Sequence, residues 1–233
     1  MRKLEDKELV HLVDEFASVA RKAILGDDTR NGKLFDKVQE CGVKLFGIRD
    51  DKFDGMCFWN QETKQPEIYL NVDQPKDRRL FTLAHELGHL FLDYGWAPGK
   101  NKIDGNKKIL SVSFRDKDKA KDTESVNERM ANEFAGAFLM PRDMVETVIS
   151  NQPDLNAKLD SIVKHFGVTD RAAVNRLIML GVINESGKLV PKIHGMRSMV
   201  CGTTSSLPVD SRVLYTGPMR MAHSPYGMWI NVE

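Results

Sequence analysis

The sequence predicts an α+β fold in three parts. Short runs of aromatic and aliphatic residues, bounded by glycine and polar turns, predict strands between residues 43 and 70. Apolar residues at steps of three and four predict helices before and after these strands. The chain has 233 residues, enough for one or two domains. We expect a domain over 1–150, a helical domain over 151–190 and a C-terminal segment of unknown role over 191–233.

Local patterns place each element within these parts. Helical spacing of apolar residues covers 4–25, 34–40, 77–94 and 124–141. Short apolar runs predict strands at 43–46, 56–59, 68–70 and 111–114. Residues 155–183 predict two helices that meet at a turn, with Thr169 or Asp170 as the N-cap of the second helix.

Composition narrows the class of protein. Lys and Arg total 34 and Asp and Glu total 33, so the formal charge is +1 and a globally basic nucleic-acid-binding protein is not expected. Three cysteines without a CxxC pair fit a reducing compartment. The N-terminus has no apolar core of a signal peptide, and no apolar run is long enough to span a membrane. We therefore expect a cytoplasmic protein that does not engage a membrane.

The residues that point to chemistry are His85, Glu86 and His89, in the order His-Glu-Leu-Gly-His. On a helix, positions four apart lie about 40° apart around the axis and one turn along it, so both imidazoles reach one metal ion. Glu86 stands at the edge of that face, where a general base touches a metal-bound water. The motif therefore predicts one zinc ion per chain, with Glu86 as the catalytic base of a peptidase.

A catalytic zinc site needs a third protein ligand, which we expect from a later helix that packs alongside the first. Glu128 is the favoured residue because it begins the next apolar helix. Glu124 and Glu133 are the alternatives. A glutamate in the first turn of a helix is also favoured by the helix dipole alone, so the pattern leaves the three residues open.

Two longer motifs carry a family resemblance. Residues 81–92 read FTLAHELGHLFL, and residues 128–141 read ERMANEFAGAFLMP. Together with EIYLN at 67–71, they resemble the ImmA/IrrE family of zinc metallopeptidases over residues 35–145. The resemblance implies a zincin-like peptidase domain, with a small sheet and active-site helices. A small helix-turn-helix-like domain follows in that family, and residues 155–183 fit it.

The resemblance also implies roles and a substrate. It makes His85, His89 and Glu128 the zinc ligands and Glu86 the catalytic base. Characterised relatives cleave helix-turn-helix repressors and so release stress or mobile-element genes. The implied function is a zinc-dependent endopeptidase that cleaves such a repressor or a related regulator and relieves repression. Two segments depart from the family pattern, namely the charged stretch 100–122, a candidate lid or exosite, and the tail 191–233.

Zincins commonly hold the substrate as an added strand on a sheet edge, which suggests where it would bind. We expect 66–72 to be that edge, with Ile68, Tyr69 and Leu70 as substrate-binding residues. The alternative is that Ile68 and Leu70 belong to the core and Tyr69 covers them.

Two further functions compete with a peptidase. The helical segment 155–183 could bind DNA through Lys164, Arg171 and Arg176, although three basic residues are few, and we favour a structural or partner-docking role. The chain could also be a non-catalytic regulatory or toxin–antitoxin-type binding module. Its metal would then be structural, and it would sequester a repressor or bind DNA.

Overall fold

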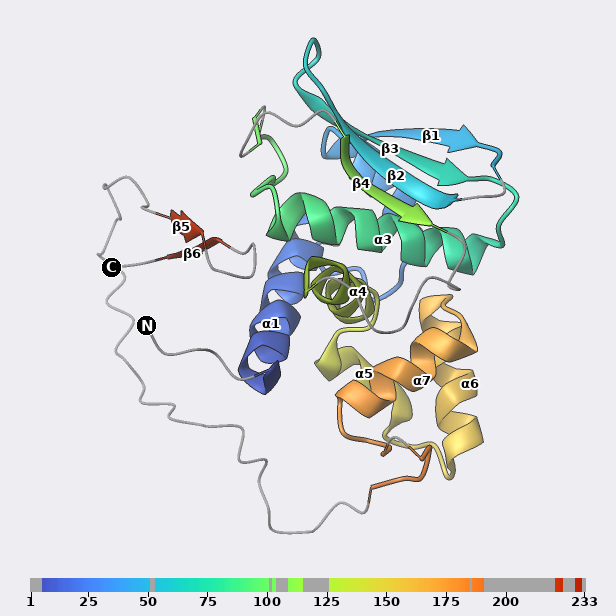
Figure 1. The fold of residues 1–233 in the computed structure, drawn as a ribbon. Coiled ribbons are helices and arrows are strands. Elements are labelled where there is room, and N and C mark those ends of the chain that lie inside the picture. The colour runs from blue at the N-terminus through green and yellow to red at the C-terminus, as the bar shows by residue number, and fades with distance from the viewer. Residues whose placement is uncertain are drawn as a thin grey trace.

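A four-stranded sheet lies on one side of a long buried helix, and further helices lie on the other side (Figure 1). The computed structural model describes residues 6–50, 53–100, 102–103, 109–114, 126–184, 186–190, 221–223 and 229–231. Most of the charged stretch 100–122 and of the tail 191–233 lies outside the described residues. Within the described part of the chain, no helix has the length and hydropathy needed to cross a membrane.

The sheet combines parallel and antiparallel pairing. Its strands are β1 (Lys44–Ile48), β2 (Phe53–Asn60), β3 (Gln65–Asn71) and β4 (Ile109–Phe114), in the spatial order β1-β3-β2-β4. β1 runs parallel to β3, whereas β2 is antiparallel to both β3 and β4. Among the described strands, the edges of the sheet are therefore β1 and β4, and the expectation that 66–72 forms an edge is wrong. Strand order depends on pairing between distant segments, which no local pattern encodes.

The helices follow the apolar periodicity closely. They are α1 (Asp6–Leu25), α2 (Leu34–Glu40), α3 (Lys76–Leu92), α4 (Val126–Leu139), α5 (Arg142–Ile149), α6 (Leu155–Phe166) and α7 (Asp170–Met179). Sequence analysis missed α5, although Pro141 stands directly before it and Val145 and Ile149 are buried one turn apart. In the tail, β5 (Met221–His223) and β6 (Trp229–Asn231) form an antiparallel pair that the sequence did not predict.

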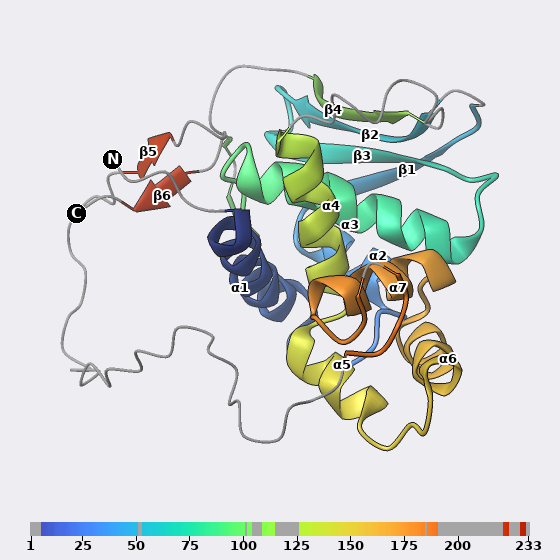
Figure 2. The same ribbon diagram turned by 60° about the horizontal axis from the view of Figure 1, so that its bottom comes forward.

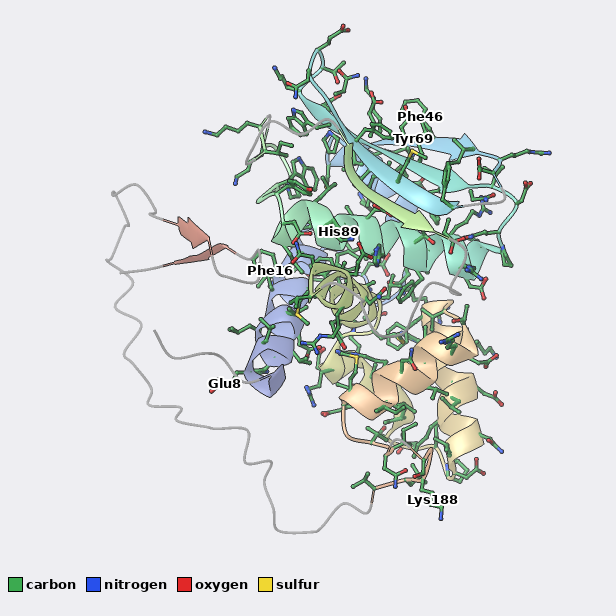
Figure 3. All side chains as sticks on the ribbon, viewed as in Figure 1. Glu8, Phe16, Phe46, Tyr69, His89 and Lys188 are labelled. Atoms are coloured by element: carbon green, nitrogen blue, oxygen red, sulfur yellow. The ribbon has the colours of Figure 1, made fainter. Side chains whose placement is uncertain are left out.

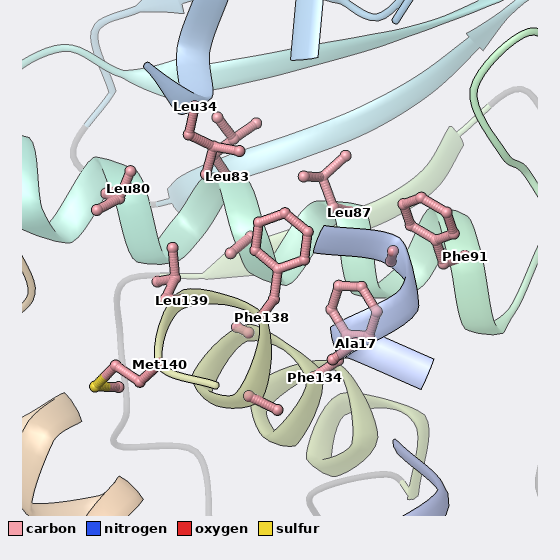
Figure 4. Close-up of a cluster of buried hydrophobic side chains, with 14 of the residues drawn as sticks. Ala17, Leu34, Leu80, Leu83, Leu87, Phe91, Phe134, Phe138, Leu139 and Met140 are labelled. Atoms are coloured by element: carbon pink, nitrogen blue, oxygen red, sulfur yellow. The ribbon is translucent and has the colours of Figure 1, made fainter. Parts of the chain in front are cut away.

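The hydrophobic core lies between α3, α4 and their neighbours. Leu83 and Leu87 of α3 and Phe134 and Phe138 of α4 are all fully buried, and Figure 4 shows them converging in one cluster. The rings of Phe134 and Phe138 stack at 5.7 Å between centroids. This cluster holds α4 along α3, and the sheet covers the opposite side of α3.

Helices α6 and α7 continue the same core. Thr169 is the N-cap of α7, where its side chain accepts a hydrogen bond from the backbone of Ala172. Phe166 and Leu177 are buried in the cluster that also includes residues of α1 and α4 (Figure 2 shows these helices together). The turned view and the shared core show two helices packed on the first part of the chain. Whether they form a helix-turn-helix domain stays a prediction.

Arg176 belongs to this packing and not to a free surface. Its side chain is 1% exposed and lies 2.5 Å from the Asp14 carboxylate of α1. Its Nε also donates to the backbone carbonyl of Met140. Arg176 is therefore unavailable for DNA, which removes one of the three basic contacts considered from the sequence.

Candidate metal centre

One face of α3 presents two buried imidazoles. His85 and His89 are one helical turn apart, and their Nε2 atoms lie 3.2 Å from each other. Their rings are nearly perpendicular, with centroids 4.8 Å apart. Figure 3 marks His89 on α3, beside α4. The helix periodicity thus brings the two nitrogens together as the sequence predicts.

Glu128, in the first turn of α4, completes the group. Its Oε2 lies 3.4 Å from His85 Nε2, and its Oε1 lies 3.3 Å from His89 Nε2. Within the described residues, these three side chains form the one group of this kind that could hold a metal ion.

Of the two alternative glutamates, Glu133 is not part of this group. Glu124 lies outside the described residues. Glu133 lies near another group: burial lowers the pKa of Arg176, and the charges of Asp14 and Glu133 act in the opposite direction.

The spacing of the three donors fits a tetrahedral metal site. Ligand atoms about 2.0–2.1 Å from zinc in a tetrahedral arrangement lie about 3.3–3.4 Å from one another. The two imidazole nitrogens are 3.2 Å apart, and a Glu128 oxygen lies close to each of them, Oε1 at 3.3 Å from His89 and Oε2 at 3.4 Å from His85, so the separations are close to that value. Two imidazoles and one carboxylate are also a donor set that catalytic zinc sites use. The residues present therefore fit a zinc ion.

A glycine lets the two helices approach closely enough for this geometry. A Cβ on Gly88 would stand 3.1 Å from the Cα of Ala131, 3.2 Å from its carbonyl oxygen and 3.2 Å from Phe134. Ala131 lies on α4 between Glu128 and Asn132, both of which reach the histidines. The space that Gly88 leaves is therefore filled by the α4 backbone.

Each histidine has a hydrogen-bond partner on its other ring nitrogen. His85 Nδ1 lies 2.9 Å from Asn132 Oδ1, and His89 Nδ1 lies 2.8 Å from Asp93 Oδ2. Sequence analysis missed both partners. Their signal is the same four-residue spacing, because Asp93 follows His89 by four positions and Asn132 follows Glu128 by four.

The electrostatics of the group favour a bound cation. Burial favours the neutral ring of His89, but its hydrogen bonds to Asp93 and Glu128 outweigh burial and raise its pKa to about 10. Hydrogen bonds from His85 and His89 hold the pKa of Glu128 well below its usual range. Without a metal, the protonated ring of His89 therefore supplies the positive charge that the surrounding carboxylates stabilise.

Glu86 follows His85 on α3, and its side chain is fully buried. Its charge acts on His89 of the metal group, where it helps to raise the pKa. It also acts on Cys57 of β2, whose thiol pKa is raised first by burial and then by Glu86. The carboxylate therefore lies within electrostatic range of both the donor group and the sheet.

The three residues expected to bind substrate lie on β3, which is an inner strand and not an edge. Ile68 and Leu70 are 0% and 5% exposed and belong to the core. Tyr69 stacks on Phe46 at 4.9 Å between ring centroids, and Figure 3 labels both on the sheet. Because β3 is hydrogen-bonded to β1 and β2, the expectation that these residues pair with an added substrate strand is wrong.

We expect Gly88→Ala to separate α3 from α4 and to weaken metal binding by about 10-fold or more, since ligand positioning of this kind controls affinity. Gly136→Ala is the matched control: it makes the same change inside a helix, here α4, and nothing stands within 4 Å of its added Cβ. Zinc competition with a chelator measures both. Equal affinity in the two variants would show that the contact at Gly88 does not set the donor spacing.

We also expect metal binding to release about one proton near pH 7, because metal ligation requires an unprotonated imidazole. The pKa of His89 is about 10 in the metal-free protein, so the ring is protonated at pH 7 and affinity rises as the pH increases toward 10. Calorimetric titration with zinc in two buffers of different ionisation enthalpy counts the protons. Release of none at pH 7 would contradict the charge state described for His89.

A known protein family matches more than half of the chain. The sequence model of the IrrE N-terminal-like domain, peptidase family M78, matches residues 38–177. A search of curated proteins finds no significant match. The matched region runs from the end of α2 into α7 and includes every residue of the metal centre. The chain therefore belongs to the ImmA/IrrE-type peptidase family M78.

Proposed function

We propose that the protein is a zinc-dependent endopeptidase that cleaves a helix-turn-helix transcriptional repressor and so relieves repression. The observation that carries this proposal is the convergence of His85, His89 and Glu128 on one point, beside Glu86. The family membership supports peptide-bond hydrolysis. The choice of a repressor as substrate follows from the resemblance to the ImmA/IrrE peptidases.

The metal and Glu86 would have separate roles in the reaction. Zinc held by His85, His89 and Glu128 would supply a Lewis acid that polarises the scissile carbonyl and makes water more acidic. Glu86 takes a proton from the attacking water as oxygen adds to the carbonyl carbon. It then gives that proton to the amide nitrogen, which leaves as a free amine.

Substrate would approach from the side of α4 where the site opens. The Glu128 side chain is 41% exposed, whereas those of His85 and His89 are 7% and 5% exposed. Access to the reacting groups is therefore past the first turn of α4, and the histidine rings form the closed inner wall.

An extended substrate segment would pair with the edge strand β4. This strand is bonded to β2 on one side and is the outer strand of the sheet. Of the two edge strands, β4 makes the more extensive contact with α3, which carries the histidines. Backbone pairing at an edge holds a peptide extended with little demand on its sequence. This geometry favours an unfolded or locally opened protein segment as substrate.

The packed helices α6 and α7 would serve as a partner-docking or structural element. Arg176 is buried against Asp14, so of the three basic residues considered for DNA only Lys164 and Arg171 remain. Two basic residues give little phosphate neutralisation. This favours docking of a protein over binding of DNA.

We expect Glu86→Gln to keep zinc and to lose cleavage by about 10²–10⁴-fold, because the amide cannot accept the proton. Glu146→Gln, an exposed change on α5, is the control and should remain active. New protein N-termini in a lysate of the source cells, after incubation with zinc-loaded protein, measure cleavage. We expect them to map to a helix-turn-helix repressor with wild type and the control. The same new termini with Glu86→Gln would refute the mechanism.

A further inference from the structure

We propose that Asn132 and Asp93 are positioning residues that make His85 and His89 unequal metal ligands, with His89 the stronger donor. Neither residue is a ligand in the proposed site, and neither touches the reacting atoms. This inference rests on the proposed metal at that site. It adds which residues set the strength of each metal–nitrogen bond.

Asn132 decides which nitrogen of His85 carries the proton. A neutral imidazole has one N–H, and the acceptor Asn132 Oδ1, 2.9 Å from Nδ1, places it there. The Nε2 lone pair is then available to a metal that His89 Nε2 and Glu128 would also bind. With the amide reversed, Asn132 would donate to Nδ1 and move the ring proton to Nε2, where it would block the metal. The carboxamide orientation is therefore a condition for binding.

Asp93 holds His89 by two bonds. Its backbone N–H donates to the carbonyl oxygen of His89 at 3.0 Å, because Asp93 is the C-cap of α3. Its carboxylate accepts from His89 Nδ1 at 2.8 Å and is 13% exposed. A carboxylate can only accept, so this partner admits a single ring tautomer. The end of α3 thus fixes the direction in which His89 Nε2 points.

The two partners differ in charge, and this difference makes the ligands unequal. An anionic acceptor on Nδ1–H increases the electron density that the opposite nitrogen offers to a metal, and a neutral amide does so less. The anionic Asp93 is the hydrogen-bond partner of His89, and the neutral Asn132 is the partner of His85. The partners are therefore not interchangeable, and conversion of one into the other should move affinity in opposite directions.

Zinc affinity of the full chain, measured by competition with a chelator, tests the inference in three variants. We expect Asn132→Leu to weaken binding by about 10–100-fold, since it removes the acceptor. Asp93→Asn should weaken it, and Asn132→Asp should bind zinc at least as tightly as wild type. Asn127→Leu and Asn127→Asp make the same changes five positions earlier on α4, and should leave affinity within about 2-fold because ligand orientation is untouched.

Nitrogen-15 NMR of the zinc-loaded protein gives a second readout, which a purely structural role would not change. We expect both histidines to carry the proton on Nδ1 in wild type and in Asn132→Asp. Wild-type zinc affinity and an unchanged His85 tautomer in Asn132→Leu would overturn the inference. If Asn132→Leu does not fold, weaker zinc binding by Asn132→Asp than by wild type overturns it. Because these readouts need no substrate, absence of peptidase activity would refute the proposed function alone.

Discussion

The close contact between α3 and α4 at Gly88 and Ala131 is the constraint on which the metal centre depends. A Cβ at position 88 would stand 3.1 Å from the Cα of Ala131, so only a glycine leaves the helices at this separation. Glu128 and Asn132, on the same side of α4 as Ala131, then reach His85 and His89. The contact that packs the two helices therefore also brings the donor group together, because Phe134 of the core lies against Gly88 as well.

Burial of α3 strengthens the electrostatic interactions among the side chains of the metal centre. The sheet covers one side of the helix and α4 the other, so both ligating rings and Glu86 lie out of water. Charges there interact more strongly than at a surface. The same burial would be costly for an uncompensated charge, and the hydrogen bonds of Asp93, Asn132 and Glu128 provide the compensation. A metal replaces a proton within a network that already stabilises positive charge.

The sequence predicted what depends on local spacing. All the helices except α5, the turn with Thr169 or Asp170 as N-cap and the face shared by His85 and His89 follow from local patterns, and Glu128 was favoured among three glutamates. It failed where distant segments decide. The inner position of β3 depends on β1 pairing with it on one side and β2 on the other, and the buried pair of Arg176 with Asp14 joins α7 to α1, two helices far apart in the sequence. Asp93 and Asn132 had the right spacing, but only the packed helices show their contact with the rings.

The central claim is that α3 and α4 together hold one metal ion through three side chains. Metal analysis of purified protein after zinc loading tests it most directly, in wild type, Glu128→Ala and Glu133→Ala. Glu133 lies on the same helix, five positions later, and its charge acts on Arg176. We expect about one zinc per chain in wild type and Glu133→Ala, and little in Glu128→Ala, since a two-histidine site lacks its third ligand. Full zinc content in Glu128→Ala, or its loss in a folded Glu133→Ala, would contradict the account.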